Sequence, residues 1–114
     1  MPRLSELLDE AVPVKFTHRG REYNLEAYPE RCTNKLRAEG AAKDATDVGA
    51  GDAHTICTLV KSWDITGDDE KPLPLDRNGI DQLSNGLKSA IILAVAQESV
   101  NPTSAASAAN SQST

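Results

Sequence analysis

The spacing of apolar residues changes early in the chain, and that change is the strongest constraint on the fold. Apolar and polar residues alternate from Val12 to Ala27 on either side of Gly20. A period of two is typical of strands, and glycine supplies the positive φ of a tight turn. Later apolar residues recur at three-and-four spacing, which favours helices. We therefore predict an α+β domain in which a β-hairpin over Val12–Ala27 packs on a small bundle of three to four helices.

The helices of this bundle are expected in separate segments. Pro29 suits the first turn of one helix, and Asp52 suits the N-cap of another. Ser84-Asn85-Gly86 interrupts the last helical stretch, so two helices with a break there are expected at least as much as one continuous helix. The expected helices cover Pro2–Ala11, about Glu30 to Ala42, Asp52 to Trp63, and Asp76 or Asn78 to about Glu98, with Lys43–Asp52 as a polar connection.

The last apolar run, within Leu87 to Gln97, is apolar without interruption from Ala90 to Ala96. We expect it to be buried on more than one side, either within the domain or against another subunit, so a homo-oligomer stays open. Leu87 and Ile91 are candidate partner-binding residues on this run. After Val100 the chain carries no charge and no large apolar residue, which predicts a single domain over residues 1–99 and a flexible tail or linker over residues 100–114.

The overall charge does not favour nucleic-acid binding. The formal net charge is −5 and the isoelectric point is about 4.9, whereas proteins that bind phosphate backbones usually present a basic face. The first third of the chain is nevertheless locally basic, and a solvated surface explains this as well as a binding face does. The basic residues are Lys15, Arg19, Arg21, Arg31, Lys35 and Arg37.

Neither the cysteines nor the apolar segments indicate a metal site, a secreted protein or a membrane protein. Cys32 and Cys57 have no paired-cysteine spacing, and nothing in the spacing of His18 and His54 recommends a zinc site. No secretory leader is recognisable, so reduced thiols and a cytosolic location are expected. The longest apolar stretch is too short to span a bilayer.

The segment from Ser62 to Leu75 holds the only tryptophan and joins two helix-like regions. Its acidic residues do not match a calcium loop, because Asp69 and Leu75 stand where an EF-hand starting at Asp64 needs glycine and glutamate. We interpret it as a packing hinge, with Trp63 ending a helix, Asp64 accepting backbone N–H bonds in the turn and Gly67 permitting the reversal. The candidate hinge or partner-binding residues here are Trp63, Asp64, Pro72, Leu73 and Leu75.

Catalytic patterns are not recognisable either, so we predict a protein without enzymatic activity and without a cofactor. The glycine-containing stretch before Ala53 has Asp52 where a phosphate loop needs lysine. Neither cysteine lies in a known catalytic signature, and two scattered histidines are a poor basis for a triad.

The order of segments resembles the small tail assembly chaperones of long-tailed bacteriophages. The matching elements are a hairpin at Val12–Ala27, a Trp-Asp turn at Leu59–Leu75 and final helices at Ile80–Val95. The resemblance implies a non-catalytic protein in the cytoplasm of an infected bacterium. Such a protein binds the tape measure protein and helps recruit tail tube subunits before leaving the finished tail. In many members a ribosomal frameshift adds a second domain, and an uncharged tail after Val100 would suit such a linker.

Two other functions stay open. One is a permanent virion component, such as a head–tail connector or a decoration protein. The other is a small regulator that binds DNA through the basic hairpin, whose affinity would fall steeply with salt. The resemblance assigns no established binding residue to this chain, because the family is defined by its layout more than by invariant side chains.

Overall fold

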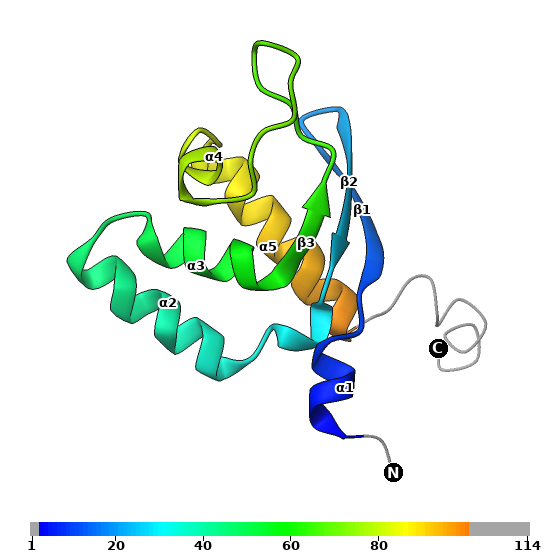
Figure 1. Ribbon diagram of the computed structural model, residues 1–114, viewed down its shortest axis with the longest axis vertical. Coiled ribbons are helices and arrows are strands. Elements are labelled where there is room, and N and C mark those ends of the chain that lie inside the picture. The colour runs from blue at the N-terminus through cyan, green and yellow to red at the C-terminus, as the bar shows by residue number, and fades with distance from the viewer. Residues whose placement is uncertain (1–2, 101–114) are drawn as a thin grey trace.

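The computed structural model describes residues 3–100, and it confirms the predicted α+β class. An antiparallel sheet of three strands in the order β1-β2-β3 packs against helices (Figure 1). The strands are β1 (Val12–His18), β2 (Arg21–Ala27) and β3 (Val60–Trp63), and the helices are α1 (Leu4–Leu8), the short 3-10 helix η1 (Pro29–Arg31), α2 (Asn34–Thr46), α3 (Ala50–Leu59), α4 (Arg77–Asp81) and α5 (Asn85–Val100). Apart from Val100, the predicted tail lies outside the described residues.

The hairpin forms as its alternation predicts. β1 and β2 pair from Val12 opposite Ala27 to His18 opposite Arg21. Arg19 and Gly20 make the two-residue turn with φ values of 54° and 78°, which is the type I′ geometry that matches the twist of paired strands. Its apolar face turns inward, so Val14, Leu25 and Ala27 are buried, while Phe16 and Tyr23 stack with ring centroids 5.3 Å apart.

The third strand corrects the prediction of a helix reaching Trp63. α3 ends at Leu59, and the chain continues as β3, which places Trp63 opposite Leu25 on β2. The change occurs where the backbone N–H of Tyr28 donates to the carbonyl of Leu59 at 2.7 Å. Pairing with β2 supplies backbone hydrogen bonds that a longer helix would have made internally, so the segment is extended instead.

The expected helix from Glu30 to Ala42 is displaced along the chain. Pro29 begins only the single turn of η1, and α2 starts at Asn34 after a break. Thr33 has an extended backbone and its hydroxyl accepts a hydrogen bond from the N–H of Leu36 at 3.2 Å. This side-chain cap fixes the start of α2, and the helix then continues to Thr46, into the stretch predicted as a loop.

The N-cap of α3 is also different from the one predicted. Gly49, with φ of 93°, occupies the N-cap position, and Asp52 lies inside the first turn. The free N–H groups at this end are bound by Asp44, whose Oδ1 accepts from Gly49 at 3.1 Å and from Gly51 at 2.8 Å. Asp44 belongs to α2, so the cap also joins the two helices.

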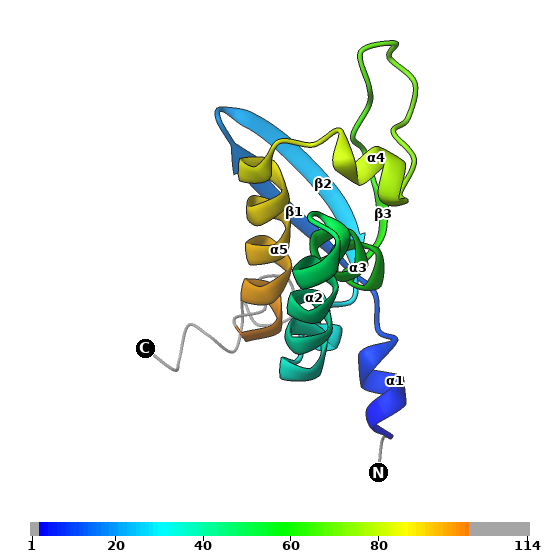
Figure 2. The same ribbon diagram turned by 90° about the vertical axis from the view of Figure 1, so that its left-hand side faces the viewer.

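The last helical region is divided into two helices, but the break lies at residues 82–84, and Asn85 and Gly86, which were expected in the break, begin α5. Asp76 caps α4 by accepting from the N–H of Gly79 at 3.0 Å, and Ser84 accepts from the N–H of Leu87 at 3.1 Å at the start of α5. α5 and α3 pack together and α5 contacts β1, while α2 lies along α3 (Figure 2). The most deeply buried side chains of the resulting core are Ile56, Leu59, Ile80, Ile91 and Val95.

Within residues 3–100 no helix combines the length and the apolar character needed to cross a bilayer.

Candidate protein-binding surfaces

A hydrogen bond from Trp63 holds the segment that follows β3 against the sheet. The indole Nε1 of this half-buried side chain donates to the carbonyl of Leu73 at 2.8 Å. The N–H of Leu73 donates in turn to the carbonyl of Ile65 at 2.9 Å. Leu73 itself is buried. The two strands of the segment are therefore held together by the indole of Trp63, by these two hydrogen bonds and by the packing of Leu73 in the core.

Asp64 extends the pairing of β2 with β3 beyond the last strand residue. Its carboxylate accepts from the backbone N–H of Asn24 at 3.1 Å and from the Asn24 side-chain amide at 3.0 Å, and its own N–H donates to the Asn24 carbonyl at 3.2 Å. The prediction that Asp64 accepts N–H groups within its own turn is therefore wrong, because its carboxylate binds Asn24 on β2.

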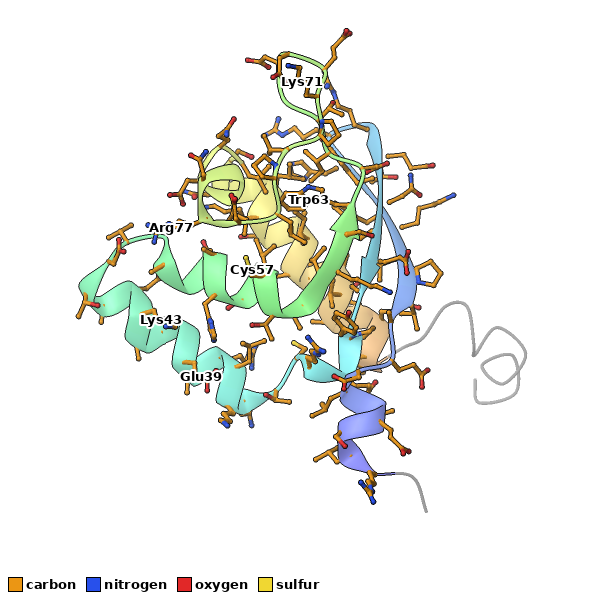
Figure 3. All side chains as sticks on the ribbon, in the orientation of Figure 1. Glu39, Lys43, Cys57, Trp63, Lys71 and Arg77 are labelled. Atoms are coloured by element: carbon orange, nitrogen blue, oxygen red, sulfur yellow. The ribbon has the colours of Figure 1, made fainter. Side chains whose placement is uncertain are left out.

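The reversal also uses a residue other than the one predicted. Glu70, not Gly67, has the positive φ, at 63°. The N–H of Gly67 donates to the carbonyl of Lys71 at 2.9 Å, and the N–H of Glu70 donates to the carbonyl of Gly67 at 3.0 Å. These contacts close a small hairpin that projects from the molecule (Figure 1), with Lys71 near its tip (Figure 3).

The structure places the remaining candidate residues in different environments. Pro72 is exposed and forms an isolated β-bridge with Thr66, and Leu75 is half-buried against the core. Leu87 and Ile91 are buried on the inner side of α5. Their side chains stabilise the fold and are not part of its surface. The candidate residues therefore form two groups. One lies at the end of β3 and in the segment after it and contains Trp63, Leu73 and Leu75, whereas Leu87 and Ile91 belong to the core.

α5 has an apolar face directed away from the domain, which the residue-by-residue prediction did not identify. Leu93 is 58% exposed and Val100 is 86% exposed, and Ala96 between them is half-buried. Spacings of three and four place these residues on one side of the helix, opposite Ile91 and Val95. We call Leu93, Ala96 and Val100 the α5 outer stripe. Their recurrence at that spacing in the sequence was the signal for a second apolar face.

Beside this stripe, a groove of about 360 Å³ runs between α5 and the first strand. Its strand side is formed by Val14, Lys15 and Phe16. Its helix side is formed by Ala94, Gln97, Glu98 and Val100, so Val100 belongs to both the stripe and the groove. We call it the β1–α5 groove. Because it combines apolar side chains with polar ones at its rim, it suits an amphipathic segment more than a purely apolar ligand.

A separate apolar surface lies on α1. This helix contains no buried residue, and its Leu4 and Leu7 are 70% and 42% exposed. The predicted amphipathic helix at this end is therefore present over a shorter range, but its leucines do not enter the core.

Arg31 fixes α1 beside the domain. Its guanidinium donates to the carbonyl of Leu8 at 3.0 Å, to the carbonyl of Thr58 at 3.2 Å and to the carboxylate of Asp9 at 2.7 Å. The same group lies 3.8 Å from the centroid of the Tyr28 ring. Arg31, which the sequence suggested only as part of a basic surface, is a structural link between α1, η1 and α3.

Most of the titrating groups with shifted pKa values belong to structural ion pairs. A hydrogen bond from His54, 3.1 Å away, lowers the pKa of Glu39 and joins α3 to α2. Hydrogen bonds from Arg77 lower the pKa of Asp47, and burial raises the pKa of the Cys57 thiol. In the described part of the chain, no group of three or more histidine, cysteine, aspartate or glutamate residues could hold a metal ion.

Comparison with known proteins finds no matching family model, no significantly similar curated protein and no significantly similar solved structure.

Proposed function

We propose that the chain is a non-enzymatic tail assembly chaperone of a long-tailed bacteriophage. In this role it binds the tape measure protein in the cytoplasm of the infected bacterium and helps recruit tail tube subunits. Two observations support the proposal. The order of hairpin, Trp-Asp turn and final helices resembles that family, and the α5 outer stripe offers an apolar helical face.

The α5 outer stripe is the observation that carries the proposal. Apolar residues that recur at three-and-four spacing allow a second helix to lie along the first, with side chains from each filling spaces on the other. A tape measure protein is a very long helical chain and provides such partners. Fully burying a leucine side chain is worth roughly 1.5–3 kcal/mol, so Leu93, 58% exposed in the free chain, would contribute a substantial part of the binding energy.

Co-expression with the tape measure protein encoded beside this chain tests the proposal. The wild-type chain should keep that protein soluble and purify with it. Leu93→Glu should strongly reduce recovery of the complex while leaving the circular dichroism spectrum of the chain unchanged, because Leu93 is exposed and glutamate is a good helix former. Val48→Glu is the matched control, since Val48 is 90% exposed in the loop between α2 and α3.

Equal recovery of the complex with Leu93→Glu and Val48→Glu would show that the stripe is not the binding face. Failure of the wild-type chain to bind any tape measure protein would remove the proposed function itself. Mass spectrometry of purified particles separates the permanent virion component from the chaperone, since a departing chaperone should be absent from mature virions. A chain abundant in those particles would favour the structural component.

A further inference from the structure

We infer that α2 is a separately opening unit, which leaves α3 and unfolds while the sheet, α3 and α5 stay folded. This inference concerns the chain alone and does not depend on the proposed tape measure partner. It rests on the contacts that hold α2 in place, which bury little apolar surface and lie mainly on one neighbouring helix. An element held in this way opens at a lower free-energy cost than the whole domain.

α2 buries little of its own surface. Of its 13 residues only Leu36 and Gly40 are buried, and Gly40 has no side chain to contribute. Within residues 3–100, α2 packs extensively on α3 alone, and it lies at the edge of the molecule (Figure 1). A helix of this length is only marginally stable in water without tertiary contacts. α2 therefore depends on one apolar side chain and on its polar contacts.

The side of α3 that meets α2 is small and polar. A Cβ atom built on Gly40 would lie 3.0 Å from Oγ1 of Thr55 and 3.4 Å from the carbonyl oxygen of Gly51. Gly51 and Thr55 share one side of α3 because they are four residues apart. Ile56 and Leu59, which are 0% exposed, lie on another side and belong to the core. Opening of α2 therefore leaves the core covered, and it presents a polar surface of α3 that the closed form hides.

The packing beside Leu36 is incomplete. A pocket of about 300 Å³ is lined by Leu36 and Glu39 of α2, by Thr58 of α3 and by Arg31 of η1. A side chain that borders such a space has fewer contacts than one surrounded by packed atoms. Leu36 therefore holds α2 less firmly than a leucine in a closely packed core would.

Carboxylates make the polar contacts between α2 and its surroundings. Glu39 pairs with His54 at 3.1 Å, and the side chain of Glu39 is 42% exposed. Asp47, the C-cap of α2, pairs with Arg77 at 3.1 Å and is 61% exposed. Ion pairs as exposed as these add little stability. The cap that Asp44 provides for α3 is thus the main polar contact that opening would break.

Native-state hydrogen exchange of the full chain, followed by NMR at several low urea concentrations, tests this inference. The amides of residues 38–46 should share one protection factor, about a hundredfold or more below those of Ile56 in α3 and Ile91 in α5. Their exchange should depend weakly on urea, because the opening exposes little surface. Exchange at Ile91 should depend steeply on urea, because it requires unfolding of the whole domain.

Two variants separate the opening of α2 from global unfolding. Ile91→Val removes a buried methyl group far from α2, so it should speed exchange in α5 about twofold to tenfold and leave the α2 amides unchanged. Leu36→Ala removes the apolar anchor and should speed exchange of the α2 amides about tenfold or more. Arg37→Ala is the matched control, because Arg37 is exposed on the same helix, and it should change the α2 rates by less than about threefold.

Equal protection and equal urea dependence in α2 and α5 would overturn the inference. It would also fail if Ile91→Val sped exchange in α2 and in α5 by the same factor, because α2 would then open only with the whole domain. Protection that falls gradually from one end of α2 indicates fraying and would contradict a single unit. If Leu36→Ala exchanged like Arg37→Ala, Leu36 would not be the anchor and the inference would be overturned.

Discussion

Replacing Gly51 with alanine should destabilise the domain, although alanine is the better helix former. Gly51 lies in the first turn of α3, where that helix crosses α2. A Cβ atom at this position would collide with the carbonyl oxygen of Gly40 and would lie 2.7 Å from Cγ of Asp44. Real Cβ contacts are almost never shorter than 3.0 Å, so the two helices would have to move apart.

The expected loss follows from three contributions. Forcing a methyl group into a packed contact costs about 1–3 kcal/mol. Displacing Asp44 from the N–H groups of Gly49 and Gly51 removes a helix cap worth about 0.5–2 kcal/mol. The higher helix propensity of alanine returns about 1 kcal/mol. The net loss is about 0.5–4 kcal/mol, and each kcal/mol lowers Tm by about 4–8 °C in a domain of this size.

Urea unfolding followed by circular dichroism measures this change, and Gly40→Ala is the matched control. Gly40 is also helical, but a Cβ atom there would meet the rotatable hydroxyl of Thr55 at 3.0 Å and the Gly51 carbonyl at 3.4 Å. The control should stay within about 1 kcal/mol of wild type, because the gain in helix propensity offsets the tight contact. If Gly51→Ala proved as stable as Gly40→Ala, the close crossing of α2 and α3 would be refuted.

Three other perturbations test separate parts of the fold. Glu70→Gly should raise the free energy of unfolding by about 0.5–1 kcal/mol, because glycine adopts the left-handed backbone conformation without strain. Glu70→Ala should not raise it, and equal unfolding midpoints for the two variants would contradict this explanation. Trp63→Phe leaves the carbonyl of Leu73 without its donor, so it should lower the free energy of unfolding, measured by thermal unfolding, by about 1–3 kcal/mol. Arg77→Met should raise the pKa of Asp47 toward its usual value in an NMR titration. Because the folded pKa of Asp47 is lowered, the stabilisation from this pair is present above about pH 4 and is lost as pH falls further, so a pH-independent difference between wild type and variant would refute it.

The hairpin and the division of the last helical region could be predicted because local sequence determines them. Alternation on both sides of Arg19 and Gly20 specifies a two-residue turn, and Ser84 marks the start of α5 with its own side chain. The start of α2 was mislocated because Pro29 is also compatible with a single helical turn. Thr33, which is a good N-cap by residue type, was the better local signal.

The third strand could not be predicted locally, because its apolar residues fit two patterns. Val60 and Trp63 continue the three-and-four spacing of Ile56 and Leu59, so they extend a helical stripe as well as a strand. The choice depends on a free edge of β2, where Leu25 lies opposite Trp63. That edge belongs to a segment far away in the chain, and periodicity contains no information about it.

The candidate site shows the same division between local and nonlocal information. The sequence identified α5 as unusually apolar, but it did not separate Leu87 and Ile91, which face the core, from Leu93 and Val100, which do not. That separation depends on which side of α5 meets α3 and β1. The partner of Asp64 is similarly nonlocal, because the carboxylate binds Asn24 on another strand.

The affinity of the purified chain for helical segments of the tape measure protein tests the proposed function most directly. Calorimetric titration should show binding by the wild-type chain and by Val48→Glu with equal affinity. Leu93→Glu should bind about tenfold or more weakly, as the loss of one buried leucine implies. Equal affinities for wild type and Leu93→Glu, or no binding by the wild-type chain, would contradict a chaperone that holds its partner on the α5 outer stripe.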